Sequence, residues 1–408
     1  MRILCAAAAY PPYGKGGGPK ASEAVAKALV ARGHTVRVIT VADNETFEVR
    51  DGVEVKTVPS LNVYWNYWVE RPAITKLVWH VLENFNPRAY FRMRREISDF
   101  QPDVVMTISA ENVNVATWVA AKSLGRPVVH MIHSYFLMCW RGTKFSKKGN
   151  CETPCWQCRL TSVGKKLCSQ AVDAVTSEAA HTLAKHQKYG YFRNATGGVI
   201  SGAVEQPAHV PERAVADSGP IRVGFIGMVA PVKGIMTLAD AATELGKDAP
   251  FEYIIAGDGD PDFLEEVSAR FPESVATFLG WTQRETFYPQ VDVVVVPSIW
   301  EEPFGNVAVE ALSYGIPVIV SRSGALPEIV EPGKSGLIFT AGDHRELADC
   351  LRHLERDRPL LRRLQQGALA RSRDYSPEAM ADSLDSFVRQ VEAAHRQGPR
   401  SRPLEADV

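Results

Sequence analysis

The sequence predicts an α/β protein with two Rossmann-like, doubly wound domains that face a central cleft. Strands and helices alternate over the first forty residues, and a second such series starts at Ile221. Between the two series, residues 201–220 are rich in Pro, Ala and charge and lack apolar periodicity, as is typical of a linker. A chain of 408 residues is also too long for one hydrophobic core and fits two domains.

The first domain, residues 1–200, opens with a strand, a Gly-rich loop, a helix and a second strand. These elements are predicted at Arg2–Ala8, Pro11–Pro19, Ala21–Arg32 and Thr35–Val41. Gly33 follows the helix, where a glycine commonly ends one. Further strands are predicted at Asp103–Ile108, Pro127–Ile132 and Ala171–Thr176. This repetition favours a parallel sheet with helices on both faces.

The second domain, residues 221–376, repeats the alternation of strands and helices. Its strands are predicted at Arg222–Ile226, Tyr253–Ala256, Thr277–Leu279, Val291–Val296 and Pro317–Val320. Residues 377–395 carry apolar side chains at helical spacing, which predicts a C-terminal helix. One possible arrangement is that this helix crosses back to the first domain. Residues 396–408 are expected to be disordered.

Composition narrows the class of protein. The formal net charge is −1, with 45% hydrophobic and 23% charged residues, so a nucleic-acid partner is not expected. No apolar run approaches the roughly 18–20 residues that a membrane-spanning helix needs. We expect a cytoplasmic protein, with the inner face of the membrane as an alternative location. In that reducing compartment the seven cysteines are expected to be free thiols or metal ligands.

Two carboxylates mark the strongest candidate site. Glu302 and Glu310 are eight positions apart, between the buried strand that ends at Val296 and a helix predicted over Val307–Leu312. In an open α/β sheet, ligands bind at the carboxyl ends of the strands. Two carboxylates at that edge suit a ligand that has two sets of hydroxyls, such as a sugar and a ribose.

The neighbouring turns suit an anion. Gly227 permits close backbone approach to a ligand, and Lys233 supplies a cation just before a predicted helix. Phe304, Gly305 and Asn306 offer backbone N–H groups at a helix N-terminus. We interpret these residues as a diphosphate site; the alternative is that Lys233 is an ordinary solvated surface lysine.

The motif order resembles a known family. G-x-x-x-x-x-K-G, A-G-D-G, P-S-x-x-E-x-F-G-x-x-x-x-E-A and S-G-x-x-P-E follow one another in the second half of the chain. This order is similar to that of glycosyltransferase family 4 (group 1), retaining enzymes of the GT-B fold. The resemblance implies a nucleotide-sugar donor (a UDP-, GDP- or ADP-sugar), a hydroxyl acceptor and no catalytic metal. It also implies that Lys233 binds the donor diphosphate, Glu302 the transferred sugar and Glu310 the ribose.

One residue departs from the family pattern. Met228 stands where most of the family has an Arg that also binds the diphosphate, and a thioether cannot neutralise phosphate charge. One branch of the family resembles this chain in lacking that Arg and in carrying a Cys-rich insert. Two alternatives stay open beside the transferase: a non-catalytic GT-B subunit that binds a sugar nucleotide, and a GT-B phosphorylase or epimerase. A polysaccharide, a lipid-linked glycan and a natural product are all candidate acceptors.

In the first domain, the resemblance aligns Gly16 and Gly17 with a loop that faces the donor phosphates. It places His133, at the end of the strand Pro127–Ile132, near the donor sugar. A single His at a strand end is otherwise usually structural, and that alternative stays open.

An insert at residues 139–168 contains a cysteine cluster. Cys139, Cys151, Cys155 and Cys158 have spacing that suits a tetrahedral structural zinc site, and Cys168 follows. Reduced thiols packed in a loop, and disulfides, are the alternatives.

Residues 61–100 combine aromatic side chains with the basic residues Arg92, Arg94 and Arg95. Such a composition suits peripheral contact with a membrane or a lipid-linked acceptor. The alternative is that the aromatic residues fill the first domain's core or line an acceptor pocket.

Overall fold

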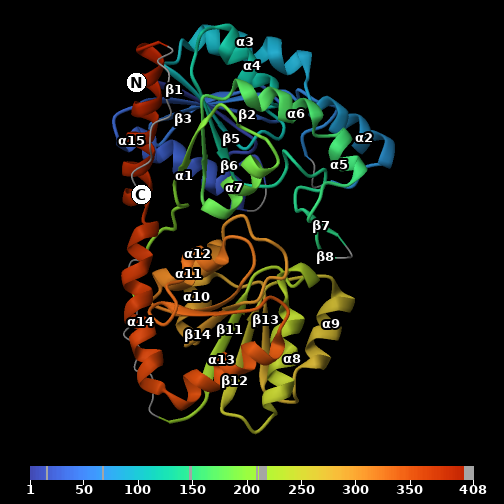
Figure 1. Cartoon of the computed structure of the whole chain (residues 1–408), viewed down its shortest axis with the longest axis vertical. Coiled ribbons are helices and arrows are strands. Elements are labelled where there is room, and N and C mark those ends of the chain that lie inside the picture. The colour runs from blue at the N-terminus through green and yellow to red at the C-terminus, as the bar shows by residue number, and fades with distance from the viewer. Residues whose placement is uncertain (15–16, 67–68, 147–148, 208–209, 211–217, 399–408) are drawn as a thin grey trace. The chain divides into compact units, whose positions relative to one another are not determined.

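The computed structural model describes residues 1–14, 17–66, 69–146, 149–207, 210 and 218–398, and it consists of two compact units (Figure 1). Unit 1 contains Met1–Lys144, Cys151–Ala203 and the chain from Pro377 onwards. Unit 2 contains Phe145–Asn150 and Val204–Ser376. The division at Ala203 falls inside the predicted linker, part of which lies outside the described residues.

Unit 1 has an eight-stranded sheet in the order β10-β9-β6-β5-β1-β2-β4-β3. Its strands are β1 (Arg2–Ala7), β2 (Thr35–Val41), β3 (Phe47–Arg50), β4 (Val53–Val58), β5 (Val104–Ile108), β6 (Val128–Ile132), β9 (Ala174–Ser177) and β10 (Thr196–Val199). All neighbouring strands are parallel except β3 and β4. The central strands β5 and β6 are buried along their whole length, as their continuous apolar sequence predicts.

Helices cover both faces of this sheet. They are α1 (Gly17–Ala31), α2 (Ala73–Leu82), α3 (Pro87–Phe100), α4 (Ala116–Ser123), α5 (Trp156–Leu160), α6 (Val163–Cys168), α7 (Ala180–Lys188) and α15 (Pro377–Arg396). Helix α15 packs against α1 and buries Leu384 and Val388 in the same apolar cluster, so the end of the described chain belongs to unit 1. His34 Nε2 lies 2.5 Å from Asp385 Oδ1 and fixes that contact.

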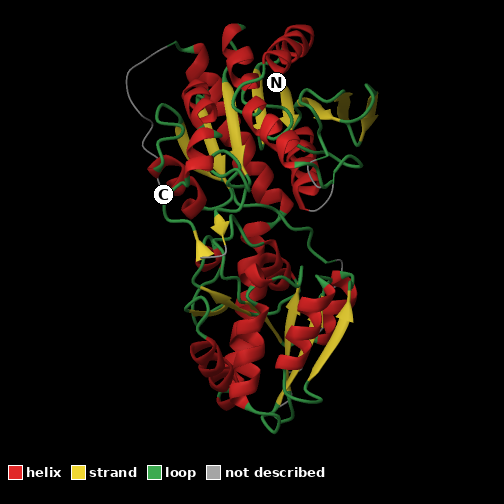
Figure 2. Ribbon diagram, turned by 90° about the vertical axis from the view of Figure 1, so that its right-hand side faces the viewer, coloured by secondary structure: helices red, strands yellow, loops and turns green. Residues whose placement is uncertain are grey.

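Unit 2 has a six-stranded parallel sheet in the order β13-β12-β11-β14-β15-β16. Its strands are β11 (Ile221–Ile226), β12 (Phe251–Ala256), β13 (Ala276–Gly280), β14 (Val293–Val296), β15 (Val318–Ser321) and β16 (Gly336–Phe339), and a separate hairpin pairs β7 (Phe145–Ser146) with β8 (Gly149–Asn150). Its helices are α8 (Ile235–Leu245), α9 (Pro261–Arg270), α10 (Arg284–Phe287), α11 (Asn306–Ser313), α12 (Leu326–Ile329), α13 (His344–Arg356) and α14 (Arg358–Ser372). In Figure 2 helices flank the strands of each unit, and the prediction of two Rossmann-like domains is confirmed.

Some boundaries differ from the predicted ones. Helix α1 begins at Gly17 instead of Ala21, because Pro19 in its first turn suits a helix start and does not end the helix. The strand predicted at Ala171–Thr176 begins only at Ala174, because Ser169–Ala171 form a 3-10 turn. Strands β3, β4, β10 and β16 and the β7–β8 hairpin were not predicted. Among the described helices, none has the length and apolar character required to cross a bilayer.

Candidate functional site

Three loops of unit 2 approach one another at the carboxyl ends of the strands, and glycines permit the approach. Gly227 follows β11 with φ +142°, and a Cβ added to Gly257, after β12, would lie 1.8 Å from Gly227 O. Gly234, which precedes α8, has φ +70°, and a Cβ there would lie 1.9 Å from Pro297 O, after β14. Both contacts require glycine, so the backbone of these turns is closely packed at the predicted ligand edge.

Lys233 and Glu302, both predicted to contact a ligand, contact each other. Lys233 Nζ lies 2.7 Å from Glu302 Oε1, and Ser298 Oγ donates to the same oxygen at 2.7 Å. Glu302 is only 7% exposed, whereas Lys233 is partly exposed. A buried carboxylate with a cationic partner and a hydroxyl donor is a fixed, charged group at the edge of the sheet.

The loop after β15 holds the backbone of Glu302. Ala325 N donates to Glu302 O at 2.9 Å, and a Cβ on Gly324 would lie 2.3 Å from both Glu302 N and Glu302 O. The S-G-x-x-P-E motif therefore positions the residue of the preceding motif.

The helix α11 provides the predicted N-terminal amides. Gly305 is its N-cap residue with φ +141°, and Asn306 is its first residue. The first amides of an α-helix have no partner within the helix and can bind an anion. The side chain of Phe304 is buried in the apolar cluster beneath, so only its backbone is free for a ligand role.

Glu310 has a partner that the sequence did not indicate. Tyr288 donates to Glu310 Oε2 at 3.1 Å, and its ring stacks on Tyr314 at 4.8 Å between centroids. Burial and the charge of Glu310 raise the pKa of Tyr288 far above its usual value, so the phenol stays a donor. Met228, in the turn after Gly227, is 57% exposed and belongs to no apolar cluster of the described residues.

A second unpredicted residue contacts the loop before Glu302. The side chain of Asn150, at the end of the β7–β8 hairpin, donates from Nδ2 to Ile299 O at 2.7 Å. Its Oδ1 accepts from Glu301 N at 3.0 Å. This amide therefore satisfies both a donor and an acceptor of the Ile299–Glu301 backbone.

In unit 1, His133 is paired with a carboxylate that the sequence analysis also missed. Its Nδ1 lies 3.2 Å from Glu178 Oε2, which follows β9, while Nε2 is buried without a hydrogen-bond partner among the described residues. Burial lowers the pKa of His133, but the charge and hydrogen bond of Glu178, with the charge of Glu111, outweigh it and raise the pKa above its usual value. Gly17 is exposed in the first turn of α1, and Gly16 lies outside the described residues.

The cysteine cluster is partly assembled. Cys155 Sγ lies 3.4 Å from Cys158 Sγ, and Lys144 N donates to Cys139 Sγ at 3.3 Å. A hydrogen bond from Cys158 lowers the pKa of Cys139 to about 6. Cys151 N donates to Lys144 O, so its backbone is tied to the same segment. The seven cysteines are free thiols, and no group of three or more His, Cys, Asp or Glu among the described residues is placed to hold a metal. The zinc site stays a prediction.

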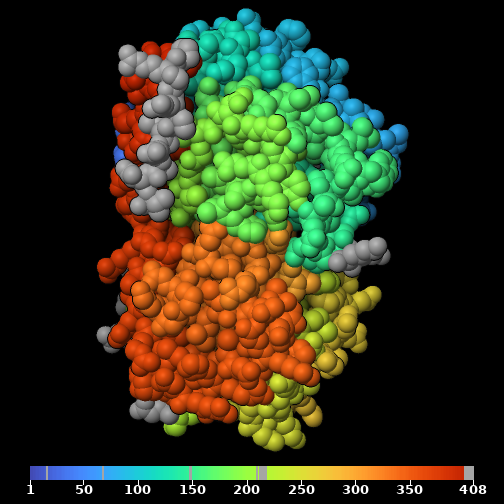
Figure 3. Space-filling model, in the orientation of Figure 1, coloured from blue at the N-terminus to red at the C-terminus, as the bar shows by residue number. Residues whose placement is uncertain are grey.

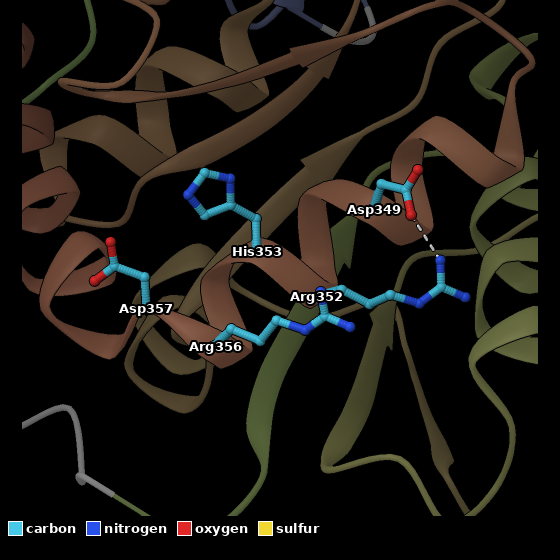
Figure 4. Close-up of a pocket in the computed structure, with 5 residues that line it drawn as sticks. All are labelled: Asp349, Arg352, His353, Arg356 and Asp357. Atoms are coloured by element: carbon cyan, nitrogen blue, oxygen red, sulfur yellow. Dashed lines mark hydrogen bonds and ion pairs between the residues drawn. The ribbon is translucent and has the colours of Figure 1, made fainter.

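A hollow of about 430 Å³ on unit 2 is not part of this site. Figure 4 shows its five lining residues, which are Asp349, Arg352, His353, Arg356 and Asp357. All belong to α13 or follow it directly, and none belongs to the loops at the strand ends. An open hollow lined by the charged groups of one helix offers no convergent ligand groups.

Comparisons with known proteins place the chain among similar sequences and folds. Residues 15–192 match the family model described as glycosyltransferase family 4, and residues 220–357 match that described as glycosyl transferases group 1. The chain is 27% identical over 332 residues to an uncharacterised 42.6 kDa protein in the cps region of Klebsiella pneumoniae, covering 81% of this chain and 87% of that one. It is 30% identical over 242 residues to a D-inositol 3-phosphate glycosyltransferase of Nocardia farcinica. That match covers 54% of this chain and 53% of the relative.

Among solved structures, the chain is similar to Anabaena Alr3699/HepE in complex with UDP. The TM-score is 0.70 with 19% identity, over 96% of this chain and 100% of that one, which supports the GT-B fold. The two family models together cover well over half of the chain, and they cover both of its α/β units. The chain therefore belongs to the family 4, or group 1, glycosyltransferases.

Proposed function

We propose that the chain is a retaining glycosyltransferase that moves a sugar from a nucleotide-sugar donor to a hydroxyl acceptor. The observation that carries the proposal is the Lys233–Glu302 pair, 2.7 Å apart among the strand-end loops of unit 2. A cation, a buried carboxylate and the N-terminal amides of α11 together suit a ligand that has both a diphosphate and hydroxyls. The UDP bound by the structurally similar Anabaena protein supports a nucleotide donor.

Each group has a role that follows from its chemistry. The Lys233 ammonium and the amides of Gly305 and Asn306 would bind the diphosphate and stabilise the charge that develops on it. Glu302 would accept hydrogen bonds from hydroxyls of the transferred sugar. Glu310, held by Tyr288, would accept those of the ribose.

Transfer needs no nucleophile from the protein. The bond between the anomeric carbon and the diphosphate oxygen breaks, and its electron pair goes to the diphosphate. The acceptor oxygen bonds to the same face of the anomeric carbon, and its proton passes to the leaving diphosphate. His133, oriented by Glu178, and the Gly16–Gly17 segment would then orient the sugar and the donor phosphates.

The exposed Met228 favours one alternative specifically. Without the usual Arg, Lys233 and the α11 amides must hold the diphosphate, and a subunit that binds a sugar nucleotide without turning it over would tolerate this loss. A phosphorylase or epimerase would instead consume the donor with phosphate, or with no acceptor at all.

The experiment is a turnover assay with sugar nucleotides and a panel of glycan, lipid-linked and small-molecule acceptors. We expect release of the nucleoside diphosphate only with acceptor present, and proton NMR of the product showing the anomeric configuration of the donor. Lys233→Met and Glu302→Gln should each lower kcat/KM at least 100-fold, whereas Lys247→Met, at an exposed lysine, should not. An inverted product contradicts the retaining mechanism, and full turnover in both site variants contradicts the site.

A further inference from the structure

Helix α2 exposes an apolar face. It buries a single residue, Trp79, although most of its side chains are apolar. Ile74, Leu77, Val78 and Val81, spaced three, four and seven positions from the first, are between 41% and 67% exposed. This spacing places all four on one side of a helix. We call these four residues the α2 stripe.

The Cys-rich insert exposes a second set of apolar residues beside it. Trp156, Leu160, Val163 and Leu167, on α5 and α6, are between 56% and 70% exposed. We call them the insert stripe. At the start of α6, Gly164 N donates to Asn84 Oδ1 at 3.0 Å, and a Cβ on Gly164 would lie 2.4 Å from Asn84 O. The end of α2 and the insert therefore pack together, and their light-blue and green atoms adjoin at the right-hand edge of unit 1 in Figure 3.

The helices that carry both stripes are anchored in the protein by buried contacts. Trp79 Nε1 donates to Tyr64 O at 3.0 Å, and the centroid of its ring lies 5.9 Å from that of Phe136. Beneath the insert, the fully buried Lys165 donates to Phe136 O at 3.1 Å. The stripes therefore belong to anchored helices, and their exposure does not result from a frayed segment.

The charge around the stripes is basic, although the net charge of the chain is −1. Residues 71–95 contain six Arg or Lys, of which Arg92 is paired with Glu45 and Glu96, and one acidic residue, Glu83, which is 1% exposed. Residues 153–167 contain no acidic residue, and besides the buried Lys165 they contain Arg159 and Lys166. Apolar side chains surrounded by cations complement the anionic headgroups and the acyl boundary of a membrane.

We propose that the α2 stripe and the insert stripe together dock on an anionic lipid surface, with the Cys-rich insert as a membrane-contact element. A second copy of the chain fits less well, because a symmetric interface would bring the same basic residues together. The proposal extends the glycosyltransferase function to a location and does not depend on it. It also gives the exposed apolar residues of the insert a role, which the contact of Asn150 with the Ile299–Glu301 backbone does not explain.

The test is co-sedimentation of the full chain with phosphatidylcholine vesicles, with and without phosphatidylglycerol. We expect binding that requires phosphatidylglycerol and weakens as salt rises. Leu77→Ser/Val81→Ser and Leu160→Ser/Leu167→Ser should each lower the bound fraction at least fivefold. Trp281→Ser is the matched control, because Trp281 is a 71% exposed aromatic residue of unit 2, and it should bind as the wild type does.

Two further measurements keep the proposal falsifiable if a variant folds poorly. Lys76→Glu/Arg88→Glu alters only exposed charges and should lower binding at low salt. Brominated lipid should quench the fluorescence of the wild type more than that of Trp156→Phe. Absence of wild-type binding at low salt, unchanged binding in both stripe variants, or a dimer that the same variants abolish would each overturn the proposal.

Discussion

The ammonium of Lys233 lies 2.7 Å from Oε1 of Glu302, so the two residues that the proposed donor site needs are bound to each other. Ser298 donates to the same oxygen, so Glu302 Oε1 has two hydrogen-bond donors. The Glu302 side chain is also buried. A diphosphate at this position has to share Lys233 with Glu302. The carboxylate therefore weakens the hold of Lys233 on the nucleotide while it provides the acceptor for sugar hydroxyls.

This competition predicts opposite effects of two substitutions on binding of a free nucleoside diphosphate. Glu302→Gln removes the competing charge and should leave the affinity unchanged or raise it severalfold, while it abolishes turnover. Lys233→Met removes the cation and should lower the affinity about tenfold or more, the loss of a contact of about 1.5–3 kcal/mol. Isothermal titration calorimetry with UDP, GDP and ADP provides the measurement. Lys247→Met is the control, and weaker binding in Glu302→Gln would rule out the competition.

Asn150 is expected to act on the donor site through the Ile299–Glu301 backbone. Asn150→Ala removes two hydrogen bonds, about 1–2 kcal/mol, and should raise KM for the donor about tenfold with a smaller effect on kcat. Asn150→Asp keeps the acceptor for Glu301 N and should recover part of the loss. Asn194→Ala, at another exposed Asn, should behave as the wild type. Equal kinetics in Asn150→Ala and Asn194→Ala would remove Asn150 from the account.

Gly234 should tolerate no side chain. It combines φ +70° with a Cβ position 1.9 Å from Pro297 O, so Gly234→Ala must shift the turn that carries Lys233. Gly33, which follows α1, has a similar φ of +80° but no atom within 4 Å of its Cβ position. Gly33→Ala therefore measures the cost of a side chain at positive φ without a close contact, about 1–2 kcal/mol, and Gly234→Ala should cost clearly more in urea unfolding. Equal costs would mean that the close contact with Pro297 is not significant.

The features of the fold that depend only on residues near one another in the sequence could be predicted from it. The buried valine run of β14, the turn at Pro297 and the start of α11 all lie within a short stretch, so the places of Glu302 and Glu310 followed from local pattern. Contacts between distant parts of the chain did not follow from local pattern. Tyr288 contacts Glu310, Glu178 contacts His133, and Asn150 contacts the loop before Glu302. These contacts depend on the order of the strands and the path of the insert, which no local periodicity encodes. The start of α1 was missed for a local reason, since Pro19 suits a first helical turn as well as a loop.

The His133–Glu178 pair should make stability depend on pH. Because the pKa of His133 is raised in the folded state, its contribution is fully present below the unfolded value of about 6.5 and is lost as pH rises through the folded pKa. The difference in Tm between the wild type and Glu178→Gln should therefore be larger at about pH 5.5 than at about pH 8.5. Differential scanning calorimetry at the two pH values measures it, and an unchanged difference would mean that the pair carries no charge.

The insert should bind about one zinc per chain if its thiolates complete a tetrahedral site. Cys139 and Cys158 lie within hydrogen-bond distance of each other, which lowers the pKa of Cys139 and raises that of Cys158, so the two sulfur atoms already share one proton. Metal analysis of the purified, reduced protein should show stoichiometric zinc that Cys155→Ser/Cys158→Ser loses and Cys5→Ser/Cys350→Ser keeps. Cys5 lies in β1 and Cys350 in α13, outside the insert, so they serve as the control pair. Reduced protein without stoichiometric metal would leave the cysteines as packed thiols.

The measurement that tests the central claim most directly is a thermal-shift comparison of the wild type, Lys233→Met and Lys247→Met with UDP-, GDP- and ADP-sugars. A donor present at about 100 times its Kd adds about 2.7 kcal/mol to the free energy of unfolding, which is a shift of a few degrees. We predict that one class of sugar nucleotide raises the Tm of the wild type and of Lys247→Met by the same amount and that of Lys233→Met clearly less, because a tenfold weaker affinity leaves only about 1.4 kcal/mol of the stabilisation. A wild type whose Tm no sugar nucleotide raises, or a rise in Lys233→Met as large as that of the wild type, would contradict the proposed donor site.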